Sequence, residues 1–238
     1  MTRAIALVLG IALLASVAAV AATAPDDVYR ALSGIPLVHH DEIVKAFEIG
    51  FSLGRLSPDR MLPLVNRLAA GAGNPQEKEG ILLVIAQALE DDLPVDLLVD
   101  KAEEGLARRV PLAVILNGSV GQSRILGLIQ RKEILEAVRD LLYSKGIFSA
   151  SGKGKAVATY LPIGRFDRIV TEVADVLCDY IESGGSPFDG HVIYGDVQAR
   201  LETLSQLCEP PFLPEDAALV LARISAGDLT SVILKVLK

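Results

Sequence analysis

The stretch HHDE places two histidines beside two carboxylates, and imidazole and carboxylate groups are common ligands of zinc and related metals. His39, His40 and Asp41 are therefore candidate metal ligands. Adjacent side chains on a helix point in different directions, however, and no third ligand follows at a fixed spacing. The structural alternative is that His40 packs one turn before Val44, while Asp41 and Glu42 occupy the first turn of a helix, where acidic groups are favourable.

A second group of candidates consists of the basic loop SGKGK and the two arginines that follow it: Lys153, Lys155, Arg165 and Arg168. SGKGK resembles part of a phosphate loop, but it lacks the Gly-x-x-x-x-Gly-Lys-Ser/Thr spacing and no clear strand precedes it. The four cations form a positive region on an acidic chain, which suits an anionic ligand or an acidic partner. The alternative is a solvated loop without a ligand.

The stretch FDGHVIYGD brings Asp189, His191 and Asp196 into one predicted loop. These residue types suit a general base or a metal ligand, but no nucleophile or completing ligand is evident elsewhere in the chain. The motifs Gly-x-Ser-x-Gly, His-Glu-x-x-His and Cys-x-x-Cys are absent from the sequence. We therefore identify no catalytic residue and no cofactor, and we favour a non-catalytic role.

Two cysteines, Cys178 and Cys208, form a possible disulfide. An oxidising compartment favours a bond between an even pair of cysteines. If the two helices that carry them form an antiparallel hairpin, however, Cys178 faces the start of the second helix and Cys208 lies near its far end. A disulfide needs Cα atoms within about 7 Å. Both the bonded and the unbonded state therefore stay open.

Residues 1–22, MTRAIALVLGIALLASVAAVAA, have the layout of a secretory signal peptide: a positive start, an apolar middle and small residues at the end. We expect cleavage after Ala21 or Ala22 and a periplasmic or extracellular location. An uncleaved membrane anchor is the alternative, although the apolar run is slightly shorter than the roughly 20 residues that a membrane span needs.

The chain carries 30 acidic and 23 basic residues, a net charge of −7. A negative surface repels phosphate backbones, so nucleic acid is not an expected partner. Outside the leader, no segment is long and apolar enough to span a membrane. The composition does not define an oligomeric state.

Apolar residues recur at helical spacing through most of the chain after the leader. The pattern predicts helices over 38–54, 75–90, 131–146 and 165–183. Gly, Ser and Lys dominate the stretch between the last two, which predicts a linker or long loop. The expected organisation is a signal peptide 1–22, a helical region 23–148, a linker 149–164 and a second helical region 165–238.

Three segments, 57–71, 93–115 and 213–227, share a proline near the start of an amphipathic helix and a glycine further on. A glycine inside a helix costs about 1 kcal/mol relative to alanine, so Gly71 and Gly227 are expected to end their helices. One amphipathic helix cannot bury its apolar face alone, whereas stacked copies can. The segments are therefore interpreted as a divergent repeat, the alternative being that capping rules alone produce the likeness.

In the segment 93–115, Pro94 suits the first turn of the helix, and Gly105 lies inside it, where it is expected to permit close helix packing. Its pattern P-x-x-x-L-x-x-K-x-x-E-G-L-A-R-x-V-P resembles a module of exported bacterial proteins of unknown function. The other two segments lack its Lys-x-x-Glu-Gly core. The resemblance implies an exported, helical, repeated protein and no activity. The matching residues are Pro94, Leu98, Lys101, Glu104, Gly105, Leu106, Ala107, Arg108, Val110 and Pro111.

These observations predict an all-α fold, either an irregular helical bundle or an α-solenoid-like array of helix pairs. The function that we expect is that of an exported, non-catalytic scaffold mediating protein–protein interaction with another protein of the cell envelope. The alternatives are a periplasmic small-molecule or metal-binding protein and an envelope hydrolase with an unrecognised site.

Overall fold

The fold is all-α, as predicted, in a computed structural model that describes residues 23–119, 124–147, 163–207 and 214–237. The predicted signal peptide 1–22 and most of the predicted linker 149–164 lie outside the described residues, and the last two residues of that linker, 163 and 164, belong to α9. The helices are α2 Pro25–Leu32, α3 His40–Ser52, α4 Pro58–Ala70, α5 Pro75–Glu90, α6 Asp96–Ala107, α7 Leu112–Asn117, α8 Leu128–Ser144, α9 Ile163–Glu182, α10 Gly190–Leu207, α11 Pro214–Leu221 and α12 Ala226–Val236.

Helix α5 shows why the chain folds locally as its sequence predicts. The side chain of Asn74 accepts a hydrogen bond from the Gln76 backbone N–H at 3.0 Å, and Pro75 occupies the first turn, where its missing N–H is no loss. The apolar run over 81–86 is largely buried, with Ile81 and Ile85 fully enclosed. Helix α5 therefore contributes its apolar run to the core.

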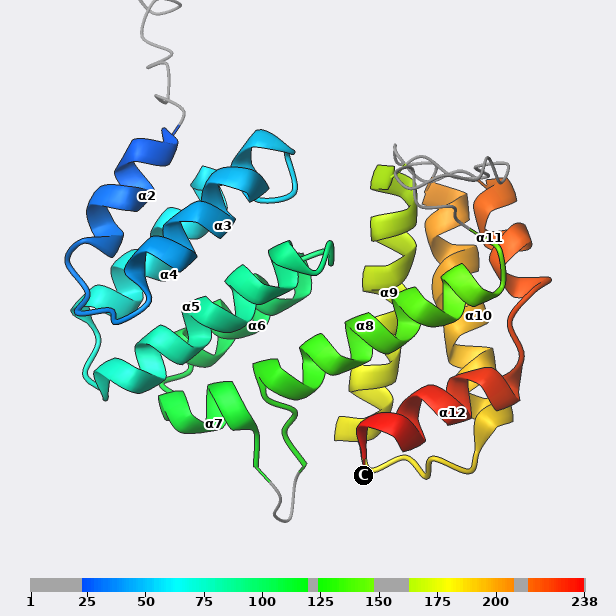
Figure 1. The fold of residues 1–238 in the computed structure, drawn as a ribbon. Coiled ribbons are helices and arrows are strands. Elements are labelled where there is room, and N and C mark those ends of the chain that lie inside the picture. Colours follow the sequence, from blue (N-terminus) through cyan, green and yellow to red (C-terminus); the bar gives the residue numbers. More distant parts are fainter. Residues whose placement is uncertain (1–22, 120–123, 148–162, 208–213, 238) are drawn as a thin grey trace, which may run out of the picture.

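The first helices form two layers, in which each helix contacts the next but one along the chain. Helix α2 packs on α4 and α4 on α6, while α3 packs on α5 and α5 on α7 (Figure 1). The core between them contains large enclosed side chains such as Phe47, Met61 and Leu64. This stacking is the array of helix pairs that the amphipathic pattern predicts.

Helix α8 joins these layers to the second group of helices, α9–α12. It contacts α5, α6 and α7 on one side and α9 and α12 on the other, and in Figure 1 it crosses from one group to the other. Its enclosed residues include Ile134, Leu135, Val138 and Leu142. Although α8 belongs to the predicted region 23–148, it packs extensively on helices of the region 165–238.

No single helix in the described part of the chain has the length and apolar character needed to cross a membrane. Helices α11 and α12 meet that test only as a pair, with a bend of 81° between them.

The expectation that Gly227 ends a single helix over 213–227 is wrong. Helix α11 ends at Leu221, and Gly227 lies in the first turn of α12. The reason is a capping box, in which the Ser225 side chain accepts from the Asp228 N–H and the Asp228 carboxylate accepts from the Ser225 N–H. Gly71, in contrast, follows α4 as its C-cap, as predicted.

The segment 93–115 also differs in detail from the prediction. Helix α6 begins at Asp96, and Val95 is its N-cap residue. Pro94 therefore precedes the helix and does not lie in its first turn. Gly105 does permit close packing: a Cβ on Gly105 would lie 2.7 Å from Ile115 Cγ1 of α7. The second half of the segment forms α7, a separate short helix that runs from Leu112 to Asn117.

Gly127 marks the closest backbone approach in this region. A Cβ at this position would collide with the backbone of Asn117 and Gly118, where the end of α7 meets the start of α8. Backbone atoms cannot rotate away as side chains do, so only glycine fits here.

We predict that Gly127→Ala lowers the free energy of unfolding by about 3 kcal/mol or more, since it overpacks a backbone contact. Gly195→Ala is the matched control, because its Cβ in α10 meets open space, and it should add about 0.5–1 kcal/mol through helix propensity. Urea denaturation followed by circular dichroism measures both. A Gly127→Ala protein as stable as the parent would contradict the close approach.

Candidate functional site

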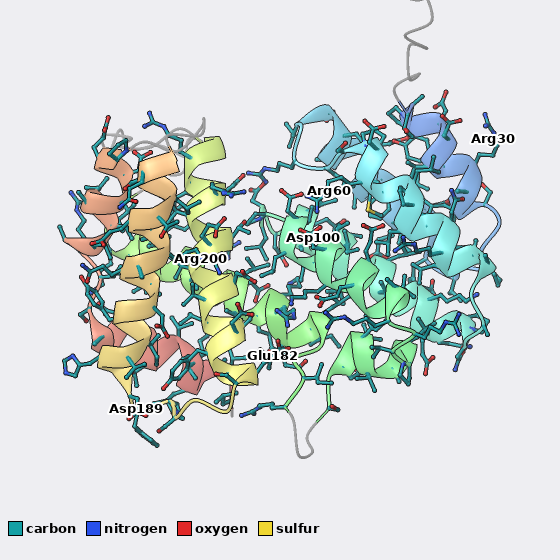
Figure 2. The ribbon with its side chains drawn as sticks, turned by 180° about the vertical axis from the view of Figure 1, so that it is seen from behind. Arg30, Arg60, Asp100, Glu182, Asp189 and Arg200 are labelled. Carbon is teal, nitrogen blue, oxygen red and sulfur yellow. The ribbon has the colours of Figure 1, made fainter. Side chains whose placement is uncertain are left out.

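A charged cleft of about 750 Å³ lies between α4 and α6 on one side and α9 and α10 on the other. In Figure 2, Arg60 and Asp100 mark the first side, and Arg200 marks the second. Five cationic and six acidic side chains line this charged cleft: Arg55, Arg60, Lys101, Arg168, Arg200, Asp96, Asp100, Glu104, Asp167, Glu172 and Asp175.

Arg60 organises the first wall. Its guanidinium, projecting from α4, binds Asp96 at 2.6 Å and also Asp100, both on α6. The two acids are four residues apart and so share one face of the helix. The Asp96 and Asp100 side chains keep 58% and 62% of their exposure, so they remain accessible from the cleft.

Glu172 organises the second wall. It lies on α9, is nearly buried, and accepts from Arg168 at 2.9 Å and from Arg200 of α10 at 3.1 Å. Arg200 also approaches Asp175 at 3.5 Å. The Arg200 and Arg168 side chains keep 39% and 46% of their exposure, so this wall presents cations to the cleft.

The two walls meet at Arg55, in the loop after α3. Arg55 Nη1 lies 2.5 Å from Asp92, and its Nε lies 3.9 Å from the Asp167 carboxylate of α9. Asp92 has a φ of 58°, in the left-handed region that favours glycine. A glycine would be less strained there but would have no carboxylate for Arg55.

Asp167 is the most perturbed acid of the cleft. The pKa of this carboxyl is raised to about 6, mainly by burial; Arg55 acts to lower it, and the negative charges of Asp92 and Asp96 act to raise it. A group of this kind titrates near neutral pH and is suited to exchanging a proton or a charged partner.

A nucleophile is not evident in the charged cleft. Among its described lining residues the only hydroxyl belongs to Thr171, which donates to the Asp167 carbonyl of its own helix at 2.9 Å. Cys178, elsewhere on α9, is fully buried, and burial raises the pKa of its thiol to about 12. The arrangement is therefore better suited to binding charged groups than to covalent catalysis.

The charged cleft continues along the surface between α9 and α10. A second hollow of about 750 Å³ lies there and shares Arg168, Glu172 and Arg200 with the cleft. We call this hollow the α9–α10 groove. Cleft and groove together form an elongated charged surface with the Arg200–Glu172 pair at their junction.

The predicted basic group is only partly assembled in the described residues. Arg168 lines the cleft, whereas Arg165 binds Asp216 of α11 at 3.1 Å and does not line it. Lys153 and Lys155 lie outside the described residues.

The predicted metal ligands have local partners. The His39 backbone N–H donates to Glu79 of α5 at 2.5 Å, and its Nδ1 lies 3.1 Å from the same oxygen. Burial acts to raise the pKa of Glu79, but these hydrogen bonds leave it lowered. His40 Nδ1 lies 3.2 Å from Asp41. The part of the chain that is described contains no group of three or more His, Cys, Asp or Glu residues suited to a metal.

The other two candidates are arranged differently from the expectation. Helix α10 begins at Gly190, so His191 and Asp196 lie on a helix and not in a loop, and only Asp189 precedes it. His191 lies in the first turn of this helix and is exposed. Cys178 is enclosed in the core, and the predicted disulfide is untested because Cys208 lies outside the described residues.

Sequence reasoning missed Arg55, Arg60, Arg200 and Asp167. A usable signal was the four-residue spacing of acids such as Asp96 and Asp100, which puts two carboxylates on one helix face. Nothing in the sequence indicated which arginine would reach them.

Searches of protein-family models, of curated proteins and of solved structures found no match to this chain. The function must therefore be inferred from the chemistry of the site itself.

We predict that Asp167→Asn stabilises the protein above pH 6. A carboxyl whose pKa is raised on folding contributes its stability fully below the unfolded pKa, near 4, and loses it as the pH rises through about 6. The amide mimics the neutral form, so its advantage should be on the order of 2 kcal/mol at pH 7.5 and should vanish below pH 4.

Melting temperatures from pH 4 to pH 8 measure this effect, with Asp189→Asn as a control outside the cleft (Figure 2). An Asp167→Asn protein that melts below the parent at pH 7.5 would contradict the burial of this carboxyl.

Proposed function

We propose that this protein is an exported, non-catalytic helical scaffold that holds an extended, charged segment of a partner protein in the cell envelope. The observation that carries the proposal is the continuity of the charged cleft with the α9–α10 groove through Arg168, Glu172 and Arg200. A hollow that runs over several helices suits an extended chain better than a compact ligand.

The ion pairs of the cleft support exchange with a partner. Within the described residues, the ion pairs of Arg60 are with acids of its own wall, Asp96 and Asp100. Those of Arg200 are likewise with Glu172 and Asp175. A partner carboxylate can therefore bind Arg200, and a partner lysine or arginine can bind Asp100, without separating the walls. The pairs of Arg60 are exposed, and exposed ion pairs contribute roughly 0–1 kcal/mol each, so replacing them costs little.

The charges also indicate which class of partner fits. The lining contains cations and acids in nearly equal number, so a segment with both signs of charge complements it better than a polyanion does. Such complementarity contributes mainly to specificity and to the rate of association. A protein segment is the partner class that carries both signs.

The export of the protein is part of the same proposal. Its support is the sequence pattern of residues 1–22, with Arg3 before an uncharged apolar run and alanines at its end.

We predict that Arg200→Glu abolishes capture of the partner. Tagged parent protein cross-linked in its native envelope should retain one dominant protein. The variant should lose that protein, because Arg200 lies at the junction of cleft and groove. The reversal places a third acid beside Glu172 and Asp175, which repels the acidic part of the segment. Quantitative mass spectrometry of the captured material measures the loss.

Arg30→Glu is the matched control for this experiment. Arg30 is an exposed arginine of α2 that pairs with Asp27 and lies away from the cleft (Figure 2). Capture should survive this change. Equal loss in both variants, or no dominant partner with the parent protein, would contradict the scaffold proposal.

We predict that protein isolated from the envelope fraction lacks the segment that ends at Ala21 or Ala22. The small residues there suit signal peptidase, so the intact mass should fall by the mass of that segment. A full-length mass in the cytosolic fraction would contradict export.

A further inference from the structure

A smaller cavity of about 210 Å³ lies where α6, α7 and α8 meet. It shares only Lys101 and Glu104 with the cleft. We call it the Arg131 cavity. Its lining comprises Lys101, Glu104, Gly105, Arg108, Val110, Val114, Ile115, Arg124, Ile125, Leu126, Leu128, Arg131 and Glu182.

Arg131 of α8 is an unusual feature of this cavity, because its side chain is only 3% exposed. Its Nη2 donates to Glu182 of α9 at 2.6 Å, and its Nε donates to the Leu126 carbonyl at 3.3 Å. Glu182 also accepts from the Leu126 N–H at 2.9 Å. The guanidinium is therefore fixed on two of its three nitrogens.

The third nitrogen, Arg131 Nη1, is buried and has no hydrogen-bond partner among the described residues. A buried donor without a partner costs about 1–3 kcal/mol, and more when it carries charge. Such groups are rare in folded proteins, and one explanation is an acceptor supplied by a bound water, ion or ligand. In this protein it belongs to a side chain that lines a cavity.

The other lining charges make the cavity positive on an acidic protein. Four cations, Lys101, Arg108, Arg124 and Arg131, face two acids, Glu104 and Glu182. Glu104 is shared by Lys101 at 3.1 Å and Arg108 at 2.8 Å, and the hydrogen bond from Lys101 lowers its pKa. An anion entering here meets a net positive environment.

The walls between these charges are apolar and come from Val110, Val114, Ile115 and Leu128. The cavity volume corresponds to about seven water molecules at about 30 Å³ each. It therefore fits a short aliphatic chain with one small polar head.

We propose that the Arg131 cavity binds a small carboxylate with a short aliphatic chain. One carboxylate oxygen accepts from Arg131 Nη1, with Lys101 and Arg124 supplying positive charge, and the aliphatic chain packs on Val114 and Ile115. The site shares Lys101 and Glu104 with the charged cleft but stands on different observations.

The carboxylate is preferred over other anions for two reasons. The planar guanidinium suits a carboxylate, and Arg131 already binds one, Glu182, through Nη2 at 2.6 Å. Inorganic phosphate would leave the apolar walls without a partner. A neutral amide of the same shape would meet the cations without charge complementarity.

Isothermal titration of the full chain with butanoate, butanamide and inorganic phosphate tests the site. We expect saturable binding of butanoate at one site per chain, at least tenfold weaker binding of butanamide, and phosphate binding weaker than that of butanoate. Absence of saturable butanoate binding would overturn the proposal. So would butanamide or phosphate binding as tightly as butanoate.

Two variants assign that binding to this cavity. Val114→Phe fills the apolar wall and should weaken butanoate at least tenfold, whereas the same exchange at the exposed Val192 of α10 should change nothing. Arg131→Lys keeps the charge but loses the planar fork, and it should also weaken butanoate at least tenfold. Unchanged butanoate binding in Val114→Phe, with the fold intact by circular dichroism, would overturn the assignment.

Discussion

The packing of α8 between two groups of helices is the constraint on which both hollows depend. Its enclosed residues Ile134, Leu135 and Val138 are buried from more than one direction, because α5–α7 and α9 with α12 contact different faces of the helix. Packed helices lie about 8–10 Å apart, so α8 fixes the distance between α6 and α9. The charged cleft lies where those two helices diverge, and the Arg131 cavity lies where α8 itself meets them.

Because α8 fixes the two walls of the cleft relative to each other, the charged side chains of the cleft can bind a ligand. The pairs of Arg60 lie within one wall, and those of Arg200 lie within the other. Across the cleft, the ion pair found in the described residues is Arg55 with Asp167, at the long distance of 3.9 Å. Strong pairs instead connect α8 to its neighbours, such as Arg131 with Glu182 and Lys145 with Asp228. Apolar burial and the α8 pairs therefore carry the architecture, and the exposed pairs of the cleft can be replaced by a ligand.

Local rules predicted the helices well and the site poorly, and the reason is physical. Helix 75–90 was predicted at the bounds of α5 because the Asn74 cap and the apolar run act within one turn or one face. The prediction over 213–227 was wrong because the capping box at Ser225 competes with the helical pattern. The partners of Arg60 follow it by 36 and 40 residues, a distance set by how α4 stacks on α6. No local pattern contains that information.

Three residues that break local rules lie at or beside the two hollows. Asp92 adopts a backbone conformation that favours glycine, Asp167 is a buried carboxyl with a raised pKa, and Arg131 is a buried donor with one unpartnered nitrogen. Each of these features costs stability. In a scaffold with no ligand to bind, a single substitution at each position would remove that cost. Asp92 and Asp167 meet at Arg55 in the charged cleft, and Arg131 lines the smaller cavity. Such costly features are frequent at binding surfaces, which supports the two hollows as the places where this protein binds its ligands, although Arg109, with a φ of 59°, and His40, with a buried unpartnered Nε2, show similar features elsewhere.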